Sequence, residues 1–253
     1  MSEIITSINE AFTAVLDGYI GLSSGLKGSL IITSFLMITT TMIGLKVKKM
    51  ELSDVPSGIT LMTVNFVDGI NDMLKGFFKV HWRKFAPYLM TILLFLAFAN
   101  TASLIGFTAP LSNISVALGF SLLAFLSIQF SALFIKSPKQ RMKDLAEPHP
   151  AFLVINLVGE MSTPFAMGLR LFGNLLSGGI MALMVFGAVD IAADAMVDLF
   201  SGLLGDVAGG VVRFIGVGIG VFIHAIFDIF FGLVQAYVYF MLLTIFLSMA
   251  VED

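Results

Sequence analysis

Long apolar runs separated by short polar segments dominate the chain. Three runs of moderate length are followed by two much longer ones, and together they cover residues 29–45, 85–107, 114–135, 151–189 and 210–251. About 20 apolar residues are enough for a helix to cross the hydrocarbon core of a bilayer. The pattern therefore predicts an all-α integral membrane protein with five membrane-crossing helices, the first of them of marginal length.

The two longest runs exceed what a membrane requires. As continuous helices they would measure about 58 and 63 Å, whereas the hydrocarbon core is about 30 Å thick. Both must therefore tilt steeply, bend or break, and Pro164 and the glycine cluster at 216–220 are the candidate bend sites. Gly216 and Gly220 are small residues four positions apart, a spacing that lets two helices approach closely. We predict that residues 151–251 form a steeply tilted hairpin of two paired helices.

A different pattern covers residues 56–83. Apolar residues recur there every three or four positions, and asparagine, aspartate and lysine occupy the opposite side. This spacing is typical of a helix with one apolar and one polar face. We predict an interfacial amphipathic helix that lies along the membrane surface, with Trp82 and Arg83 near its end as anchors. The alternative is an ordinary membrane-proximal loop with no specific orientation.

Composition assigns the whole chain to the membrane. Of its 253 residues, 58% are hydrophobic and only 12% are charged, whereas soluble domains carry about 25% charged residues. The apolar runs leave no room for a soluble domain, so residues 1–253 are predicted to form a single membrane domain. With no cysteine and with three histidines far apart in the sequence, we expect no disulfide, no metal site and no cofactor. We also expect no nucleic-acid partner.

Charged residues predict the orientation. Of fourteen lysines and arginines, seven lie in 46–84 and four in 136–143, whereas residues 190–209 contain four aspartates and no basic residue. By the positive-inside rule the two basic segments face the cytoplasm. The N-terminal lead, residues 1–28, and the acidic linker 190–209 then lie outside, and the C-terminus lies in the cytoplasm. The lead carries three acidic residues and one lysine, so it lacks the basic start of a secretory signal.

Arg170 is the only basic residue inside the run 151–189. A charge at the centre of a bilayer costs roughly 2.5–3.5 kcal/mol, so such residues are usually functional. The alternative is a structural arginine that is satisfied by backbone carbonyls or that reaches the interface. Asn174 and Ser177 share the helix face of Arg170, because residues three and four positions apart are neighbours on a helix.

A second polar row follows in the last run. His224 and Asp228 are one helical turn apart, and Gln235 lies about 20° from Asp228 around a regular helix axis. Tyr239 is one further turn along, and Arg213 lies close to the same face. Such rows usually line ion or proton paths in membrane proteins. The alternative is hydrogen bonding between helices without a transport role.

Glu160 is the remaining ionisable group in the long runs. It lies a few turns from the basic loop at 136–143 and about 80° around the helix from Arg170. It either lines an aqueous path or reaches the membrane interface.

Two segments carry a family resemblance. GLRLFGN at 168–174 and QAYVYFMLLTIFLSMA at 235–250 resemble subunit a of the bacterial F-type rotary ATP synthase. The resemblance extends more loosely through residues 100–126, NTASLIGFTAPLSNISVALGFSLLAFL, and the N-terminal third matches mainly in layout. An arginine within RLFGN combined with a glutamine in the last helix is a far more specific signal than a single glycine motif.

The resemblance implies a stator wall against which a ring of c subunits turns. Two offset half-channels would pass protons to and from carboxyl groups on that ring, with Arg170 between them. Gln235 and Asn174 match neighbours of that arginine in the family. The implied partners are the c ring, the peripheral-stalk b subunits and other synthase subunits in a bacterial plasma membrane. ATP chemistry would take place in those other subunits, so the chain is not an enzyme by itself. Protons are the expected ion, although sodium stays open.

The chain departs from the family at one position. Many members carry an acid or a histidine nine residues after the arginine, where this chain has Gly179. We therefore predict that Asp228 is the main proton group of the outer half-channel and that His224 supplies the imidazole. Glu160 matches an acidic position of some bacterial members and would belong to the cytoplasmic half-channel. Ser177, Arg213 and Tyr239 are supporting positions.

Two other readings compete with this one. A stand-alone secondary transporter or ion channel would explain the buried charges but not the paired motifs. A membrane scaffold would leave Arg170 and Asp228 unexplained. The sequence contains no phosphate-binding glycine loop and no nucleophile elbow, which argues against a soluble-type enzyme.

Overall fold

The computed structural model describes residues 24–50, 56–79, 81–105, 109–135, 146, 149, 152–200 and 202–252. These residues are almost wholly helical, and none of them lies in a strand. The predicted all-α fold is therefore confirmed for the described part of the chain. Most of the N-terminal lead and most of the polar loop at 136–150 lie outside the described residues.

The described residues form a succession of helices. In chain order they are α2 (Ser24–Lys48), α3 (Ile59–Phe78), α4 (Trp82–Thr101), the short 3-10 helices η1 (Ala102–Ile105) and η2 (Pro110–Ser112), α5 (Ile114–Ile135), α7 (Phe152–Leu199), α8 (Leu203–Ile226), the π-helix η3 (Phe227–Phe231) and α9 (Gly232–Glu252).

Within the described residues, five helical stretches are long and apolar enough to cross a membrane, which agrees with the predicted number. They are Gly25–Lys48, Trp82–Leu104, Ile114–Ile135, Leu153–Leu199 and Leu203–Val251. The first has 24 residues and is therefore longer than the predicted run 29–45. Its last turn contains Lys46 and Lys48, whose positive charges favour the C-terminal end of a helix.

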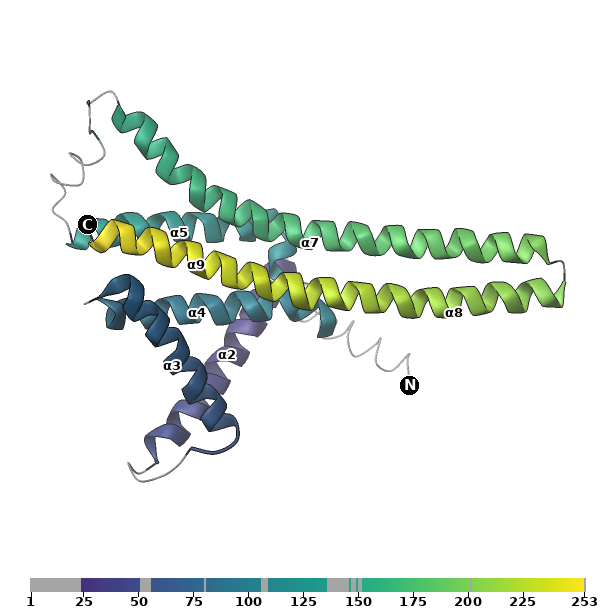
Figure 1. Ribbon diagram of the computed structural model, residues 1–253, viewed down its shortest axis with the longest axis horizontal. Helices are drawn as coiled ribbons and strands as arrows, with labels where there is room; N and C mark the ends of the chain where they lie inside the picture. The colour runs from purple at the N-terminus through teal and green to yellow at the C-terminus, as the bar shows by residue number, and fades with distance from the viewer. Residues whose placement is uncertain are drawn as a thin grey trace, which may run out of the picture.

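The core lies where α4, α5 and α9 meet (Figure 1). Phe240, Leu243 and Leu247 of α9 are fully buried there, as are Leu89 and Leu96 of α4. Burying a large apolar side chain against other protein atoms excludes voids and gains close packing contacts. These contacts fix α9 against α4, and thus determine which side of the last helix is turned toward its neighbours.

The amphipathic segment is shorter than its sequence pattern suggests. α3 ends at Phe78, while Trp82 and Arg83 begin α4 instead of closing the amphipathic helix. Lys79 follows α3 with a backbone φ of 35°, which is incompatible with continuing a right-handed helix. Phe78 is buried in the core and stacks on Phe85 of α4 with ring centroids 4.9 Å apart. This packing turns the chain sharply between α3 and α4.

α7 and α8 form the predicted hairpin, which extends as an arm beyond the other helices (Figure 1). Most of residues 190–209, expected to be an acidic linker, belongs to these two helices, so the turn itself is short. The two helices touch through glycines. A Cβ atom added to Gly216 would lie 2.2 Å from Cγ1 of Val189, and one added to Gly220 would lie 2.5 Å from Cε1 of Phe186. The predicted close approach at these glycines is confirmed.

The long helices deviate from straight α-helices at different places. α7 continues through Pro164, and Figure 1 shows that its first part slopes away from α9 before the rest runs beside α8. In the second long run, Gly216 and Gly220 lie within the regular helix α8, and the irregularity is the π-helix at Phe227–Phe231. A π-turn accommodates one extra residue per turn, and such turns often occur at functional sites. The steep tilt of both helices stays a prediction.

Candidate functional site

Asp228 is the buried carboxylate at the centre of the site. Only 6% of the residue is exposed, and it lies within the π-helix. The Ser103 hydroxyl donates a hydrogen bond of 2.5 Å to Oδ2 of Asp228. His224 Nε2 lies 3.4 Å from the same oxygen, which agrees with the prediction that the two residues share a helix face. A carboxylate, a hydroxyl and an imidazole thus meet within a bundle of apolar helices.

Two further helices enclose Asp228. A Cβ atom added to Gly178 of α7 would lie 3.7 Å from Oδ1 of Asp228, so the small residue on α7 faces the carboxylate. At the end of α4, Asn100 Nδ2 donates a hydrogen bond of 2.9 Å to the carbonyl of Gly232. A Cβ atom at Gly232 would lie 3.0 Å from Cβ of Asn100. This close contact joins the end of α4 to the residue that follows the π-helix.

Three polar atoms on the helices that pack around the π-helix are buried without a hydrogen-bond partner among the described residues. Among the described residues, the buried side-chain atoms that lack a hydrogen-bond partner are Asn100 Oδ1, His224 Nδ1 and Gln235 Oε1. Leaving such an atom unpaired in an apolar interior costs about 1–3 kcal/mol. Buried atoms of this kind are usually paired with protein or ordered water. Their position at the end of α4 and on either side of the π-helix therefore favours a hydrated polar path.

The polar row of the last run is interrupted by the π-helix, which contains Asp228 and precedes Gln235. The expected separation of about 20° assumes a regular α-helix, whereas a π-turn winds less per residue. The shared face of Asp228 and Gln235 therefore stays a prediction. Tyr239 instead turns to α5, where its hydroxyl donates a hydrogen bond of 2.8 Å to the carbonyl of Phe120. Tyr239 thus contributes to the packing of α9 on α5, while Asp228 faces α4 and α7.

Arg170 lies on the open surface of α7. Its side chain is exposed, and within the described part of the chain it has no hydrogen bond or ion pair. Leu169 and Leu176 nearby are also strongly exposed. The alternative of an arginine satisfied by backbone carbonyls is therefore not observed. The structure presents a single charge on a largely apolar helix surface.

The two polar neighbours of Arg170 differ in exposure. Asn174 is half-buried, whereas Ser177 is exposed. The Ser177 hydroxyl donates a hydrogen bond of 2.9 Å to the backbone carbonyl of Asn174. Its proton is thus used within α7, which suits a local structural role.

Glu160 has a partner that the sequence analysis missed. Gln129 Nε2 of α5 donates a hydrogen bond of 2.6 Å to Oε2 of Glu160 on α7. Both side chains are half-buried, so the pair bridges α5 and α7 at a distance from Asp228. Gln129 is the only amide side chain in the run 114–135. An isolated amide in an apolar run could have indicated a polar contact with another helix.

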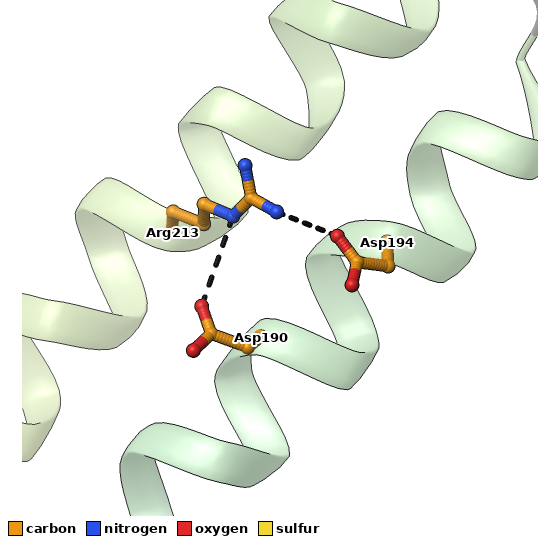
Figure 2. A network of polar contacts seen from close by, with 3 residues as sticks. All are labelled: Asp190, Asp194 and Arg213. Carbon is orange, nitrogen blue, oxygen red and sulfur yellow. Dashed lines mark hydrogen bonds and ion pairs between the residues drawn. The ribbon is translucent and has the colours of Figure 1, made fainter.

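Arg213 is held by two aspartates of α7 (Figure 2). Its Nε lies 3.7 Å from Oδ1 of Asp190, and its NH2 donates a hydrogen bond of 2.5 Å to Oδ1 of Asp194. His224 is eleven residues further on, about 16 Å along a helix axis. The structure therefore separates Arg213 from Asp228 and makes it a link between α7 and α8 along the arm.

Ser103 and Asn100 were also missed as site residues. Both belong to the short polar stretch NTAS at 100–103 near the end of an apolar run. Polar residues near the end of a transmembrane helix commonly face water, so this stretch gave no reason to expect a contact with residues more than 120 positions away. Among the described residues, no group of three His, Cys, Asp or Glu side chains could hold a metal ion.

The fold and site define a helical membrane protein that spans the bilayer several times and keeps a carboxylate and an imidazole between its long helices. Residues 28–248 match the family described as ATP synthase A chain. The chain therefore belongs to this family, subunit a of the F-type ATP synthase, which confirms the resemblance noted in its sequence.

Individual relatives agree with this family. ATP synthase subunit a 2 of Chlorobaculum tepidum is 30% identical, and the match covers 85% of this chain and 59% of that protein. ATP synthase subunit a 2 of Bradyrhizobium sp. is 24% identical, with 87% of each chain covered. ATP synthase subunit a of Chlorobium phaeobacteroides is 27% identical, with 87% of this chain and 62% of the relative covered. This chain thus spans about three fifths of the Chlorobaculum and Chlorobium proteins.

Proposed function

We propose that this chain is the stator ion-channel subunit of a rotary ATP synthase in a bacterial plasma membrane. The observation that carries the proposal is the buried Asp228, which contacts Ser103 and His224 between apolar helices. A titratable carboxylate in that setting is suited to passing protons. Family membership supports the same role, and ATP chemistry belongs to other subunits of the complex.

The surface of α7 around Arg170 faces a ring of c subunits in this proposal. The guanidinium is exposed among apolar side chains, as required of a group that meets a carboxyl group on a passing partner. Its fixed positive charge favours the ionised form of that carboxyl group. Arginine stays protonated at physiological pH, so it does not itself carry a proton between the two sides.

Two polar clusters supply the half-channels. The outer one is built from Asp228 and His224 together with the unpaired atoms of Asn100 and Gln235. The cytoplasmic one contains Glu160 with Gln129. Arg170 and Asn174 lie between these clusters along α7. Peripheral-stalk b subunits complete the stator, the N-terminus lies outside, and the C-terminus lies in the cytoplasm.

The test is proton flux in membranes that contain the assembled complex with Arg170→Ala. We expect ATP-driven pumping to be lost while passive proton leak persists or rises, because the barrier between the half-channels is removed. Arg213→Gln is the matched control, since it removes an arginine from the arm and should leave most of the pumping intact. Retained pumping in Arg170→Ala would make Arg170 structural and return the chain to the class of stand-alone channels or transporters.

A further inference from the structure

Basic residues gather at the turn between α3 and α4, beside the only tryptophan of the chain. Within ten positions lie Lys75, Lys79, Arg83 and Lys84, and all four side chains are exposed. We call these four residues together with Trp82 the basic turn. Such a density of lysine and arginine on an amphipathic helix next to a membrane-spanning helix is typical of segments that bind anionic lipids.

The indole ring of Trp82 contacts two of these cations. Lys75 Nζ lies 5.1 Å from the centroid of the ring, and Arg83 Cζ lies 5.4 Å from it. Both distances are within the range of cation–π contacts. The ring therefore helps to position two positively charged side chains. An anion bound beside the ring would balance their charge.

Local acidic residues balance only part of this charge. Asp72 forms an ion pair of 2.7 Å with Lys75. Within the described part of the chain, Arg83 and Lys84 have no acidic partner. Among the described residues, the basic turn therefore keeps a net positive charge on an exposed surface. This charge is complementary to a phosphate group.

The N-terminal half of α3 offers apolar surface on the same helix as Lys75. Ile59 and Met62 are 72% and 74% exposed, and Phe66 is also exposed. At the other end of the helix, Leu74 and Phe78 are buried in the core. A helix with both an exposed apolar surface and exposed basic residues is suited to the boundary between headgroups and acyl chains. Tryptophan prefers the same depth.

We propose that the basic turn binds the phosphate headgroup of an anionic phospholipid, whose acyl chains lie along the exposed apolar side of α3. The charges select an anionic over a zwitterionic headgroup, and the adjacent apolar side chains select a lipid over free phosphate. This proposal is independent of the proton path, because no residue of the basic turn touches Asp228, Arg170 or Glu160 among the described contacts.

The test uses the assembled complex in nanodiscs of phosphatidylcholine with a minor fraction of phosphatidylglycerol. Retained phosphatidylglycerol is counted by native mass spectrometry, and spin-labelled phosphatidylglycerol reports the immobilised fraction. Each basic side chain that contacts the bound headgroup is expected to contribute about fivefold to lipid affinity. Lys75→Gln combined with Arg83→Gln should therefore weaken retention about 25-fold. The matched control is Lys46→Gln combined with Lys48→Gln, which removes two exposed lysines of α2 and should keep retention near the unmodified value.

A second variant separates the site from general surface charge. Trp82→Leu keeps every charge but removes the ring that contacts Lys75 and Arg83, and we expect retention to fall severalfold. The proposal is overturned if both charge pairs reduce retention equally, or if phosphatidylcholine is lost to the same extent. It is also overturned if millimolar inorganic phosphate displaces the lipid, because the basic turn would then bind phosphate itself. Loss of assembly with other subunits without loss of lipid would overturn it as well, because the basic turn would then bind an acidic protein segment.

Discussion

At the scale of single residues, the site depends on which hydrogen-bond donors reach a buried carboxylate. The Ser103 hydroxyl and the His224 imidazole both approach Oδ2 of Asp228. A hydrogen bond to a charged group contributes about 1.5–3 kcal/mol, so Ser103 helps to hold the Asp228 carboxylate in place. Arg170, in contrast, is exposed on α7, so the interactions of its guanidinium depend on the partner that contacts this surface.

Replacing Asp228 tests the proton group itself. In the variant Asp228→Asn the side-chain amide could still accept the hydrogen bond from Ser103, but an amide neither releases nor takes up a proton at physiological pH. We expect Asp228→Asn to lower ATP-driven proton pumping by about tenfold or more, measured by fluorescence quenching in inverted vesicles. Ser103→Ala should produce a smaller loss, and Ser103→Thr, which keeps a hydroxyl, should restore activity. Unchanged pumping in Asp228→Asn would remove this residue from the path.

The pair of Glu160 and Gln129 permits a similar test of the proposed cytoplasmic half-channel. Glu160→Gln keeps the size of the side chain but removes its charge and its exchangeable proton, so we expect pumping to fall severalfold. Asp206→Asn is the control, because Asp206 is an exposed carboxylate near the tip of the arm. If both variants pump at the unmodified rate, Glu160 serves only to join α5 and α7 through Gln129.

At the scale of elements, the hairpin depends on glycines at the contact between α7 and α8. Gly216 packs against Val189, and Gly220 packs against Phe186. Neither glycine has room for a Cβ atom. Between them, Gly218 has nothing within 4 Å of an added Cβ atom. The ion pairs of Arg213 with Asp190 and Asp194 join the same two helices further along the arm. Close glycine packing and a polar link therefore hold together two helices that extend beyond the bundle.

Gly216→Ala tests this packing against a control in the same helix. The added methyl group would collide with the branched Val189 side chain, and overpacking of this kind costs about 1–3 kcal/mol. We expect a lower melting temperature of the purified complex, measured by differential scanning fluorimetry. Gly218→Ala should leave stability unchanged or raise it, because alanine favours a helix over glycine by about 1 kcal/mol. Equal melting temperatures for the two variants would show that the arm tolerates a wider helix spacing.

At the scale of the whole molecule, the arm exceeds the thickness of a membrane. α7 has 48 residues, which corresponds to about 72 Å of helix, whereas the hydrocarbon core measures about 30 Å. If the apolar part of the arm stays within the bilayer, the helices must run obliquely through it. A long oblique surface that carries Arg170 is well suited to lie along a ring of partner helices.

The absence of cysteine makes the orientation directly testable. A single cysteine at Asp198, near the tip of the arm, should react with a membrane-impermeant maleimide from the outside. A single cysteine at Lys48, in the last turn of α2, should react only from the cytoplasmic side. Right-side-out and inverted vesicles provide the two measurements, and ATP-driven pumping verifies that each variant assembles. The reverse labelling pattern would contradict the predicted orientation.

The sequence by itself determined the class of fold and the most specific residues. Five apolar stretches predict five helices, because lipid offers no partner for backbone groups and a helix satisfies them internally. Arg170 and Asp228 were identified because any ionisable group in an apolar run is costly and therefore conspicuous. The contact between His224 and Asp228 could also be predicted, since it depends only on the pitch of one helix.

Only the tertiary structure decided which residues from other helices complete the site. Ser103 reaches Asp228 across 125 positions, and Asn100 reaches Gly232 across 132, because the packing of α4 on α9 sets their relative register. The π-helix could not be predicted from a pattern that assumes a constant 100° per residue, and the hydrogen bond of Tyr239 to Phe120 depends on how α9 packs on α5. Local spacing fixes contacts within one helix, whereas contacts between helices depend on how whole surfaces fit together.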